Sequence, residues 1–179
     1  MNIKHSIANY ALLLSCAVAV AGVHADTSAD LDATDELGGH YSGSGNSHGN
    51  YTSIVQVGEL NTIAIRQYGN YNHVDSAQTD AANYTDIEQM GDELLVYSAQ
   101  EGLQNSLYLE QKGHGNQLYS KQQGKYNSLN AVQNGSDIQA SVSQYGDNNL
   151  VELKQLGNGL RTQIIQDGNN LHATILQGL

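Results

Sequence analysis

Residues 67–78 read QYGNYNHVDSAQ, and the two glutamines that bound this stretch are eleven positions apart. The same interval continues in both directions without a break. It places glutamine at twelve positions: Gln56, Gln67, Gln78, Gln89, Gln100, Gln111, Gln122, Gln133, Gln144, Gln155, Gln166 and Gln177. A fixed period over so many residues is typical of repeat architectures, in which each repeat contributes one equivalent residue to a shared structure.

From residue 50 onward the chain divides into twelve windows of eleven residues, such as NTIAIRQYGNY (61–71) and NSLYLEQKGHG (105–115). If the places in a window are numbered one to eleven, glutamine always occupies place seven. Place one is Leu or Ile in four windows and asparagine in the other eight: Asn50, Asn61, Asn72, Asn83, Asn105, Asn116, Asn127 and Asn149. Place nine is glycine in ten windows: Gly58, Gly69, Gly91, Gly102, Gly113, Gly124, Gly135, Gly146, Gly157 and Gly168. We predict that these glycines lie in turns, and that the glutamine and asparagine columns serve self-assembly.

The distribution of charge within the windows indicates strands. Places one, three, five and seven contain no Asp, Glu, Lys or Arg, whereas charged residues occur at places two, four and six and in the last four places. Such alternation indicates a β-strand with one buried and one exposed face. The last four places are rich in Gly, Asn and Asp, which favour tight turns because they tolerate positive φ angles. Each window is therefore predicted to be a strand followed by a turn.

The exceptions at place five indicate how many windows make one coil. Ser76, Ser98 and Ser120 replace aliphatic residues in every second window. A coil of three windows would spread these serines over three sides, whereas a coil of two windows places them on one sheet. The sequence therefore predicts an all-β fold, a two-sided parallel β-solenoid (β-helix) of about six 22-residue coils with two strand-turn units per coil. Buried amides would bond to identical amides in the adjacent coil, ~4.8 Å away.

The first 25 residues have the features of a secretory signal peptide. Lys4 precedes an apolar run, and the tripeptide VHA ending at Ala25 fits a cleavage site that requires small residues. A membrane-spanning helix is the alternative, but the apolar run is shorter than the ~20 residues that a span needs. Lipidation at Cys16 is a second alternative. We expect residues 1–25 to be removed from the mature protein.

Residues 26–49 differ in composition from the repeats. They are acidic at first and then rich in Gly, Ser, Asn and His. A segment with so little to bury is expected to be flexible, and His40 and His48 are expected to be solvated rather than metal ligands. Residues 50–179 form the predicted repeat core.

The composition limits the classes of function that the chain can serve. It has 179 residues, no Pro, Trp or Phe, and a formal net charge of −11, which argues against nucleic acid as a partner. The carboxylates are scattered over outward places and turns, and no Ser/His/acid signature is present, so we expect no enzyme activity. His114 and His172 are isolated, and Cys16 is the single cysteine. We expect no cofactor and no metal site.

At this point the repeats can be set beside a known family. The pattern N-x5-Q-x-G, repeated at eleven residues within a 22-residue unit, closely resembles the curlins, the subunits of curli amyloid fibres. NTIAIRQYGNYN (61–72) and AQTDAANYTDIEQMG (77–91) resemble repeats of the major subunit, whereas ELLVYSAQEGLQN (93–105) is closer to the minor, nucleating subunit. The resemblance covers about residues 50–179.

The resemblance implies a function and a set of partners. Curlins are secreted, and they self-assemble into extracellular fibres on Gram-negative cells that support adhesion and biofilm formation. The family implies a homopolymer, a partner curlin subunit, an outer-membrane secretion pore and periplasmic assembly factors. Because no capping element is visible beyond the first or last window, we expect the last strand of one copy to template the first strand of the next.

The chain departs from the family pattern in ways that bear on its role. Curlins commonly have five repeat units, whereas six are present here, and the serine frequent at place one of odd windows is Asn or an aliphatic residue here. The last repeat of the minor subunit usually breaks the pattern with basic residues, whereas RTQIIQDGNNLHATILQGL (161–179) stays regular. This favours the fibre-forming subunit over a surface nucleator. A monomeric β-solenoid adhesin and an ice-binding protein remain as alternatives of another class.

Two outward-facing sets of residues have open interpretations. Tyr97, Tyr108 and Tyr119 share place four, and Tyr97 and Tyr119 are expected to stack on one sheet, either as an adhesive or lateral-packing surface or through β-propensity alone. Acidic residues also lie in the turns: Asp80, Asp92, Asp137, Asp147 and Asp167. They are either gatekeepers that delay assembly or ordinary turn formers.

Overall fold

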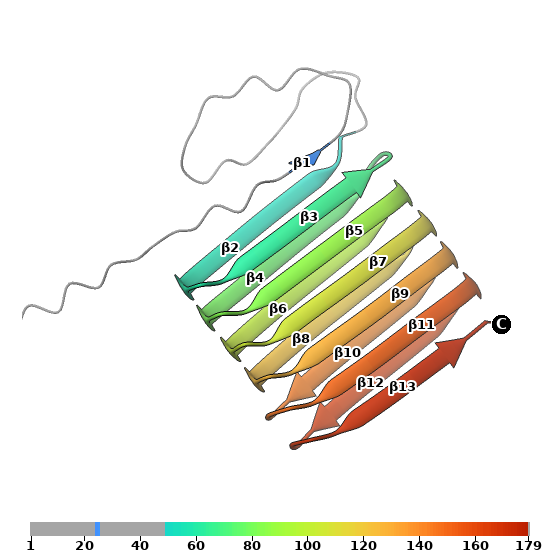
Figure 1. Cartoon of the computed structure of the whole chain (residues 1–179). Helices are drawn as coiled ribbons and strands as arrows, with labels where there is room; N and C mark the ends of the chain where they lie inside the picture. The colour runs from blue at the N-terminus through green and yellow to red at the C-terminus, as the bar shows by residue number, and fades with distance from the viewer. Residues whose placement is uncertain (1–23, 26–48, 179) are drawn as a thin grey trace, which may run out of the picture.

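The computed structural model describes residues 24–25 and 49–178 (Figure 1). The predicted signal peptide up to residue 23, including Cys16, and residues 26–48, including His40 and His48, lie outside the described residues. So does Leu179. The boundaries proposed for the signal peptide and the flexible segment therefore remain predictions.

The described chain is built from strands joined by short turns. The strands are β1 (His24–Ala25), β2 (Tyr51–Glu59), β3 (Thr62–Tyr68), β4 (His73–Ala81), β5 (Tyr84–Asp92), β6 (Leu95–Leu103), β7 (Ser106–His114), β8 (Gln117–Lys125), β9 (Ser128–Ser136), β10 (Gln139–Tyr145), β11 (Leu150–Asn158), β12 (Arg161–Asp167) and β13 (His172–Gln177). No helix in the part of the chain that the structure describes is long and apolar enough to cross a membrane.

The strands form two parallel sheets that face each other. One sheet has the order β1-β3-β5-β7-β9-β11-β13, and the other has the order β12-β10-β8-β6-β4-β2. Figure 1 shows the two layers, with β2 and β3 at one end of the stack and β12 and β13 at the other. Successive strands alternate between the sheets, so two strands and two turns complete one coil. The predicted two-sided parallel β-solenoid of six coils is confirmed.

The pairing register confirms the 22-residue coil. Gln67 pairs with Gln89, and Ser76 pairs with Ser98, each 22 positions further along the chain. The serines at place five all lie in the β2-containing sheet, on β4, β6 and β8, as predicted. The opposite sheet carries the aliphatic residues expected at this place: Ile65, Ile87, Leu109, Ala131, Leu153 and Ile175.

The core is the thin layer between the sheets. Burial alternates along each strand, as in β9, where Leu129, Ala131 and Gln133 are buried and the residues between them are more exposed. Leu107, Leu129 and Val151 lie in adjacent strands and stack in one column. Each large aliphatic side chain buried in this way contributes roughly 1.5–3 kcal/mol to folding. The core cluster of the described residues is built from Ile, Leu, Val and Ala.

The turn glycines are required by two independent constraints. At place nine the φ angle is positive and large, for example +115° at Gly113, a region that side chains other than glycine rarely adopt. A Cβ atom at Gly113 would also lie 1.9 Å from the carbonyl oxygen of Gly135 in the next coil. The coils therefore touch, backbone to backbone, at eight of the ten turns, whereas Gly157 and Gly168 have no backbone atom of another coil this close. Asp80, the exception at this place, has a φ angle of only 72°.

A second positive φ angle lies at place eleven, where residues other than Gly, Asn and Asp also adopt it. Leu60, Glu93 and Tyr126 adopt the left-handed conformation there, with φ angles of 59°, 57° and 59°. This conformation costs a residue with a side chain roughly 1–2 kcal/mol. It also directs the backbone N–H at place eleven to a carbonyl in the preceding coil, as from Tyr126 to Leu103 at 3.0 Å. The hydrogen bond compensates for the strain, so place eleven accepts many residue types.

Candidate functional site

The glutamine side chains form two continuous hydrogen-bonded columns, one on each sheet. The column on the β2 side links Gln56, Gln78, Gln100, Gln122, Gln144 and Gln166, and the column on the β3 side links Gln67, Gln89, Gln111, Gln133, Gln155 and Gln177. In every step the Nε2 atom donates to the Oε1 atom 22 residues later, at distances such as 2.7 Å for Gln111 to Gln133 and 3.0 Å for Gln133 to Gln155. All donors in a column therefore point the same way.

Most of the glutamines also bind across the core. The second proton on Nε2 of Gln67 reaches the carbonyl oxygen of Tyr51 in the opposite sheet at 3.2 Å. Gln122 bonds in the same way to the carbonyl of Ser106 at 2.9 Å. The amide thus joins adjacent coils and both sheets at once. The sequence analysis did not predict this second hydrogen bond. The one sequence feature that points to it is that glutamine occupies place seven in every window.

The asparagines act differently from the glutamines. Their Oδ1 atoms accept the backbone N–H of the residue 22 positions later, even where that residue is Leu94 or Ile138. Their Nδ2 atoms bind turn carbonyls, as Asn116 does with Lys112 at 2.9 Å and Gly135 at 3.0 Å. The asparagines therefore clamp the turns of adjacent coils together.

Direct asparagine-to-asparagine bonds are confined to one stretch of the solenoid. In the described coils, amide-to-amide hydrogen bonds run from Asn105 to Asn83 and from Asn127 to Asn105, each at 3.1 Å. All three residues are buried. The asparagine side-chain ladder expected from the sequence therefore extends only over these three residues. The role of the asparagines in self-assembly remains a prediction.

The turn aspartates include at least two structural residues. Oδ1 of Asp92 accepts hydrogen bonds from the backbone and side-chain nitrogens of Asn70, at 2.9 and 3.0 Å. These bonds lower the pKa of the Asp92 carboxyl. Oδ1 of Asp147 accepts the backbone N–H of Lys125 at 2.9 Å. For Asp92 and Asp147 these contacts favour the turn-former interpretation over a gatekeeper role.

An aromatic stripe follows the outer face of the β2-containing sheet. Tyr97 and Tyr119 are stacked, with ring centroids 5.3 Å apart and an interplanar angle of 14°, which confirms the predicted stacking. Tyr51 stacks on His73 at 4.6 Å, and His73 lies 5.7 Å from Tyr97. The stripe therefore includes a histidine that sequence reasoning missed. Tyr108 lies on β7, in the other sheet.

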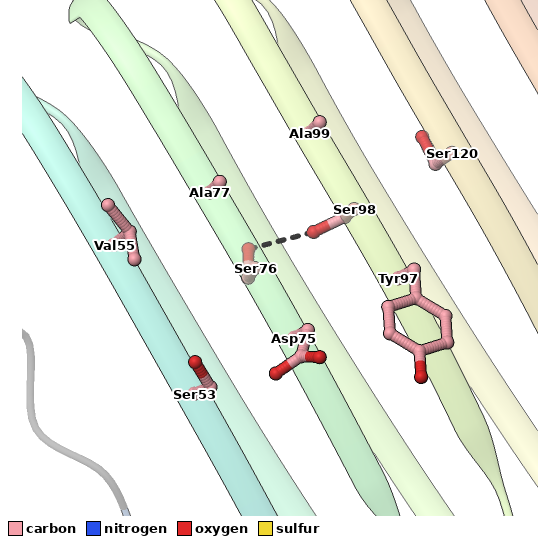
Figure 2. Close-up of a pocket in the computed structure, with 9 residues that line it drawn as sticks. All are labelled: Ser53, Val55, Asp75, Ser76, Ala77, Tyr97, Ser98, Ala99 and Ser120. Carbon is pink, nitrogen blue, oxygen red and sulfur yellow. Dashed lines mark hydrogen bonds between the residues drawn. The ribbon is translucent and has the colours of Figure 1, made fainter. Parts of the chain in front are cut away.

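A shallow depression lies beside this stripe, across β2, β4, β6 and β8 (Figure 2). Its lining residues are Ser53, Val55, Asp75, Ser76, Ala77, Tyr97, Ser98, Ala99 and Ser120. The hydroxyls of Ser76 and Ser98 are bonded to each other at 2.8 Å, and the buried Ser120 hydroxyl has no hydrogen-bond partner. No histidine is among the residues that line the depression, so no imidazole lies there to activate these serine hydroxyls. Within the described ranges, no three His, Cys, Asp or Glu side chains gather closely enough to hold a metal ion.

The outer face of the other sheet carries ion pairs between coils. Arg66 contacts Asp86 at 2.7 Å and Glu88 at 3.3 Å. Burial opposes the charge of Arg66, but the two carboxylates outweigh it and raise the pKa of the guanidinium. Lys112 also pairs with Glu110, but within the same strand, β7. Because these ion pairs are partly exposed to solvent, each contributes at most about 1 kcal/mol to the stability of the fold.

The strands at the two ends of the stack have one unpaired edge. In the described chain β2 pairs only with β4, β12 only with β10, and β13 only with β11. The two residues of β1 cover β3 only at Arg66 and Gln67. Apolar side chains at these ends are exposed: Val55 54%, Val57 52%, Ile165 63% and Leu176 53%. The fold thus brings Gln56 and Gln67 to one end of the stack and Gln166 and Gln177 to the other.

Comparison with known proteins identifies the repeats. The profile of the curlin associated repeat matches residues 81–113, 124–157 and 146–178. No curated protein and no solved structure matches the chain. The matched segments lie within the stacked coils, so the similarity concerns the repeating unit of the solenoid.

Proposed function

The chain belongs to the curlin family of extracellular fibre subunits, and from this premise we propose that it polymerises end to end into a curli-type amyloid fibre. The curlin repeat and the β-solenoid are structural rather than enzymatic families. In this proposal the functional site is the pair of unpaired strand edges at the two ends of the stack.

The unfinished glutamine columns are the observation that carries the proposal. If the 22-residue register continues into a second copy, β12 pairs with β2 of that copy and β13 pairs with its β3. Gln166 then lies on Gln56, and Gln177 lies on Gln67. Because every Nε2 donates toward the C-terminal end, this end offers donors and the N-terminal end offers Oε1 acceptors. The columns match only when copies stack head to tail.

The exposed apolar side chains support the same contact. Stacking in this register brings Ile165 beside Val55 on the outer face of the sheet, and both are more than half exposed in the single chain. An unpaired strand edge with exposed aliphatic residues is a site for strand addition unless charge or a cap blocks it. Removal of residues 1–25 would also remove β1 and uncover the whole edge of β3.

Secretion and assembly partners follow from the family rather than from the contacts. We infer that the chain passes an outer-membrane secretion pore with periplasmic assembly factors, and that the fibre supports adhesion and biofilm formation at the cell surface. The net charge of −11 would keep the unassembled chain soluble during export.

The fibre-forming subunit is the preferred role within the family. Strands β12 and β13 keep the register of the preceding coils, with Gln144 paired to Gln166 and Gln155 to Gln177. A regular last coil supports continued elongation. The alternative is a minor curlin that nucleates the major subunit, and reciprocal seeding with a partner curlin separates the two roles. A nucleator accelerates the partner strongly but elongates poorly by itself.

The proposal is tested with the purified mature chain. We expect fibres that bind thioflavin and diffract at the ~4.8 Å strand spacing. Leu129→Pro removes a ladder N–H from the middle of β9 and should abolish growth, whereas Leu129→Ile should preserve it. A wild-type chain that sediments as a folded monomer for days would contradict polymerisation and favour a monomeric adhesin.

A further inference from the structure

Three threonines face the core at place three, where the other windows have aliphatic residues. They are Thr52, Thr85 and Thr162. In the β2-containing sheet, the two end strands carry Thr52 and Thr162 at this place. The four strands between them carry Val74, Val96, Leu118 and Ala140. The polar residues of this column are therefore at the two ends of the sheet.

Thr85 shows what a threonine at this place does inside the solenoid. Gln78 Nε2 donates to Thr85 Oγ1 at 3.1 Å, and Thr85 Oγ1 donates to Gln100 Oε1 at 2.9 Å. All three side chains are buried. The hydroxyl thus accepts from one glutamine of the opposite column and donates to the next. We call this arrangement the glutamine–threonine bridge.

Thr162 forms a second complete bridge in the last coil. Gln155 Nε2 donates to Thr162 Oγ1 at 3.0 Å, and Thr162 Oγ1 donates to Gln177 Oε1 at 2.7 Å. In both bridges the donor glutamine precedes the threonine by seven residues, and the acceptor glutamine follows it by 15. The two bridges therefore have the same geometry.

Thr52 forms only half of a bridge. Its Oγ1 donates to Gln67 Oε1 at 2.8 Å, which is the second bond of the arrangement. Among the described residues no glutamine donates to Thr52 Oγ1, because the coil that would supply it precedes the first one. At the other end of the stack, Gln177 Nε2 donates to no described residue. Among the described residues, the bridge therefore lacks a donor at one end of the stack and an acceptor at the other.

We infer that Gln177 of one copy donates to Thr52 of the next copy and that this bond sets the register of the contact. The inference rests on the proposed end-to-end polymerisation. If the 22-residue register continues across the junction, Gln177 of one copy stands seven places before Thr52 of the next copy. Gln78 stands at the same distance before Thr85. The completed path across the junction runs through Gln155, Thr162, Gln177, Thr52 and Gln67. The N-terminal end of the stack, with Thr52, therefore binds the C-terminal end of a second copy of the chain.

Other ways of stacking do not complete the bridge. If the first coil of the second copy is displaced, β12 lies on β4, and Val74 takes the place of Thr52. The Gln177 amide then meets methyl groups instead of a hydroxyl. If two N-terminal ends meet, acceptors face acceptors at Gln56 and Gln67. Thr52 therefore distinguishes the correct coil of the correct end, which the uniform glutamine columns alone do not.

Seeds made from variant fibres test the inference. Preformed seeds of wild type, Thr52→Val and Thr85→Val are extended with wild-type chain, and two-colour microscopy measures the delay before each end grows. We expect Thr52→Val to lengthen the delay roughly tenfold at one end only, since the hydrogen bond from Gln177 to Thr52 Oγ1 is not formed at the junction. Thr85→Val removes a bridge inside the seed, so both of its ends should grow like wild type.

A second variant identifies the other partner. Gln177→Leu seeds should be delayed at the end that Thr52→Val leaves unaffected. Equal delays for Thr52→Val and wild-type seeds at both ends would overturn the inference, as would equal slowing by Thr85→Val. Wild-type fibres would still grow in that case, so polymerisation itself would stand. Absence of any wild-type fibre would instead refute the proposed function.

Discussion

The side-chain nitrogen of Gln111 lies 2.7 Å from the side-chain oxygen of Gln133, 22 residues later in the chain, and both side chains are fully buried. A hydrogen bond of this kind contributes only about 1 kcal/mol net, but leaving one of its groups unpaired in the core costs more. The columns therefore penalise every misalignment of the coils. Their main effect is on register, and the stability comes largely from the aliphatic residues beside them.

Replacing one glutamine inside a column tests this account. Gln111→Leu keeps a similar volume but leaves the Gln89 amide without its acceptor and the Gln133 oxygen without its donor. We expect the free energy of unfolding to fall by roughly 2–4 kcal/mol in denaturant titrations followed by circular dichroism. Gln123→Leu, at an exposed place of β8, is the matched control and should change it by less than about 0.5 kcal/mol.

The two kinds of turn position should respond differently to alanine. Gly113→Ala combines a φ angle of +115° with a Cβ atom 1.9 Å from a carbonyl oxygen, and should cost more than about 3 kcal/mol. Gly159→Ala has a φ angle of +65° and nothing within 4 Å, so it should cost only about 1 kcal/mol. Thermal unfolding of both variants measures the difference. Similar losses would show that close contact between coils is unimportant.

The serine column contains one unfavourable hydroxyl. Ser120 Oγ is buried without a partner, so Ser120→Ala should raise the free energy of unfolding by about 1 kcal/mol. Ser98→Ala instead leaves the Ser76 hydroxyl unpaired and should lower it by a similar amount. Denaturant midpoints of the two variants should therefore move in opposite directions from wild type. Movement in the same direction would rule out this explanation.

The Asp92 turn should loosen in acid. Hydrogen bonds from Asn70 lower the pKa of Asp92 below its usual 3.8, so the folded state favours the carboxylate. The stabilisation is present above the pKa of the unfolded chain and is lost as pH falls through the lower folded pKa. In Asp92→Asn the amide oxygen still accepts the bonds but does not titrate. Backbone amide signals of Asn70 should shift below about pH 4 in wild type and stay constant in this variant.

Several features of the fold were accessible from residue types alone. Glutamine at every eleventh residue identified the buried face, and Ser76, Ser98 and Ser120 distinguished two sheets from three. Gly113 and its equivalents identified the turns. These inferences succeeded because a strand exposes alternate residues, so a one-residue error in reading would reverse the faces.

Other features depended on the path of the backbone. The left-handed conformation of Glu93 and Tyr126 leaves no signature in residue type, because the compensating hydrogen bond comes from backbone atoms of another coil. The bond from Gln67 to the Tyr51 carbonyl depends on the separation of the two sheets. The same separation allows Thr85 to reach Gln78 and Gln100.

The amino-acid sequence by itself thus determined the repeat, the buried face and the number of coils, since these depend only on periodicity and on which side chains avoid water. The tertiary structure decided the direction and the ends of the hydrogen-bonded columns. It showed that Gln177 carries a donor and Thr52 an acceptor with no partner among the described residues. The reason is physical: hydrogen bonds are directional, and their direction is set only when the two sheets lie at a definite distance and register.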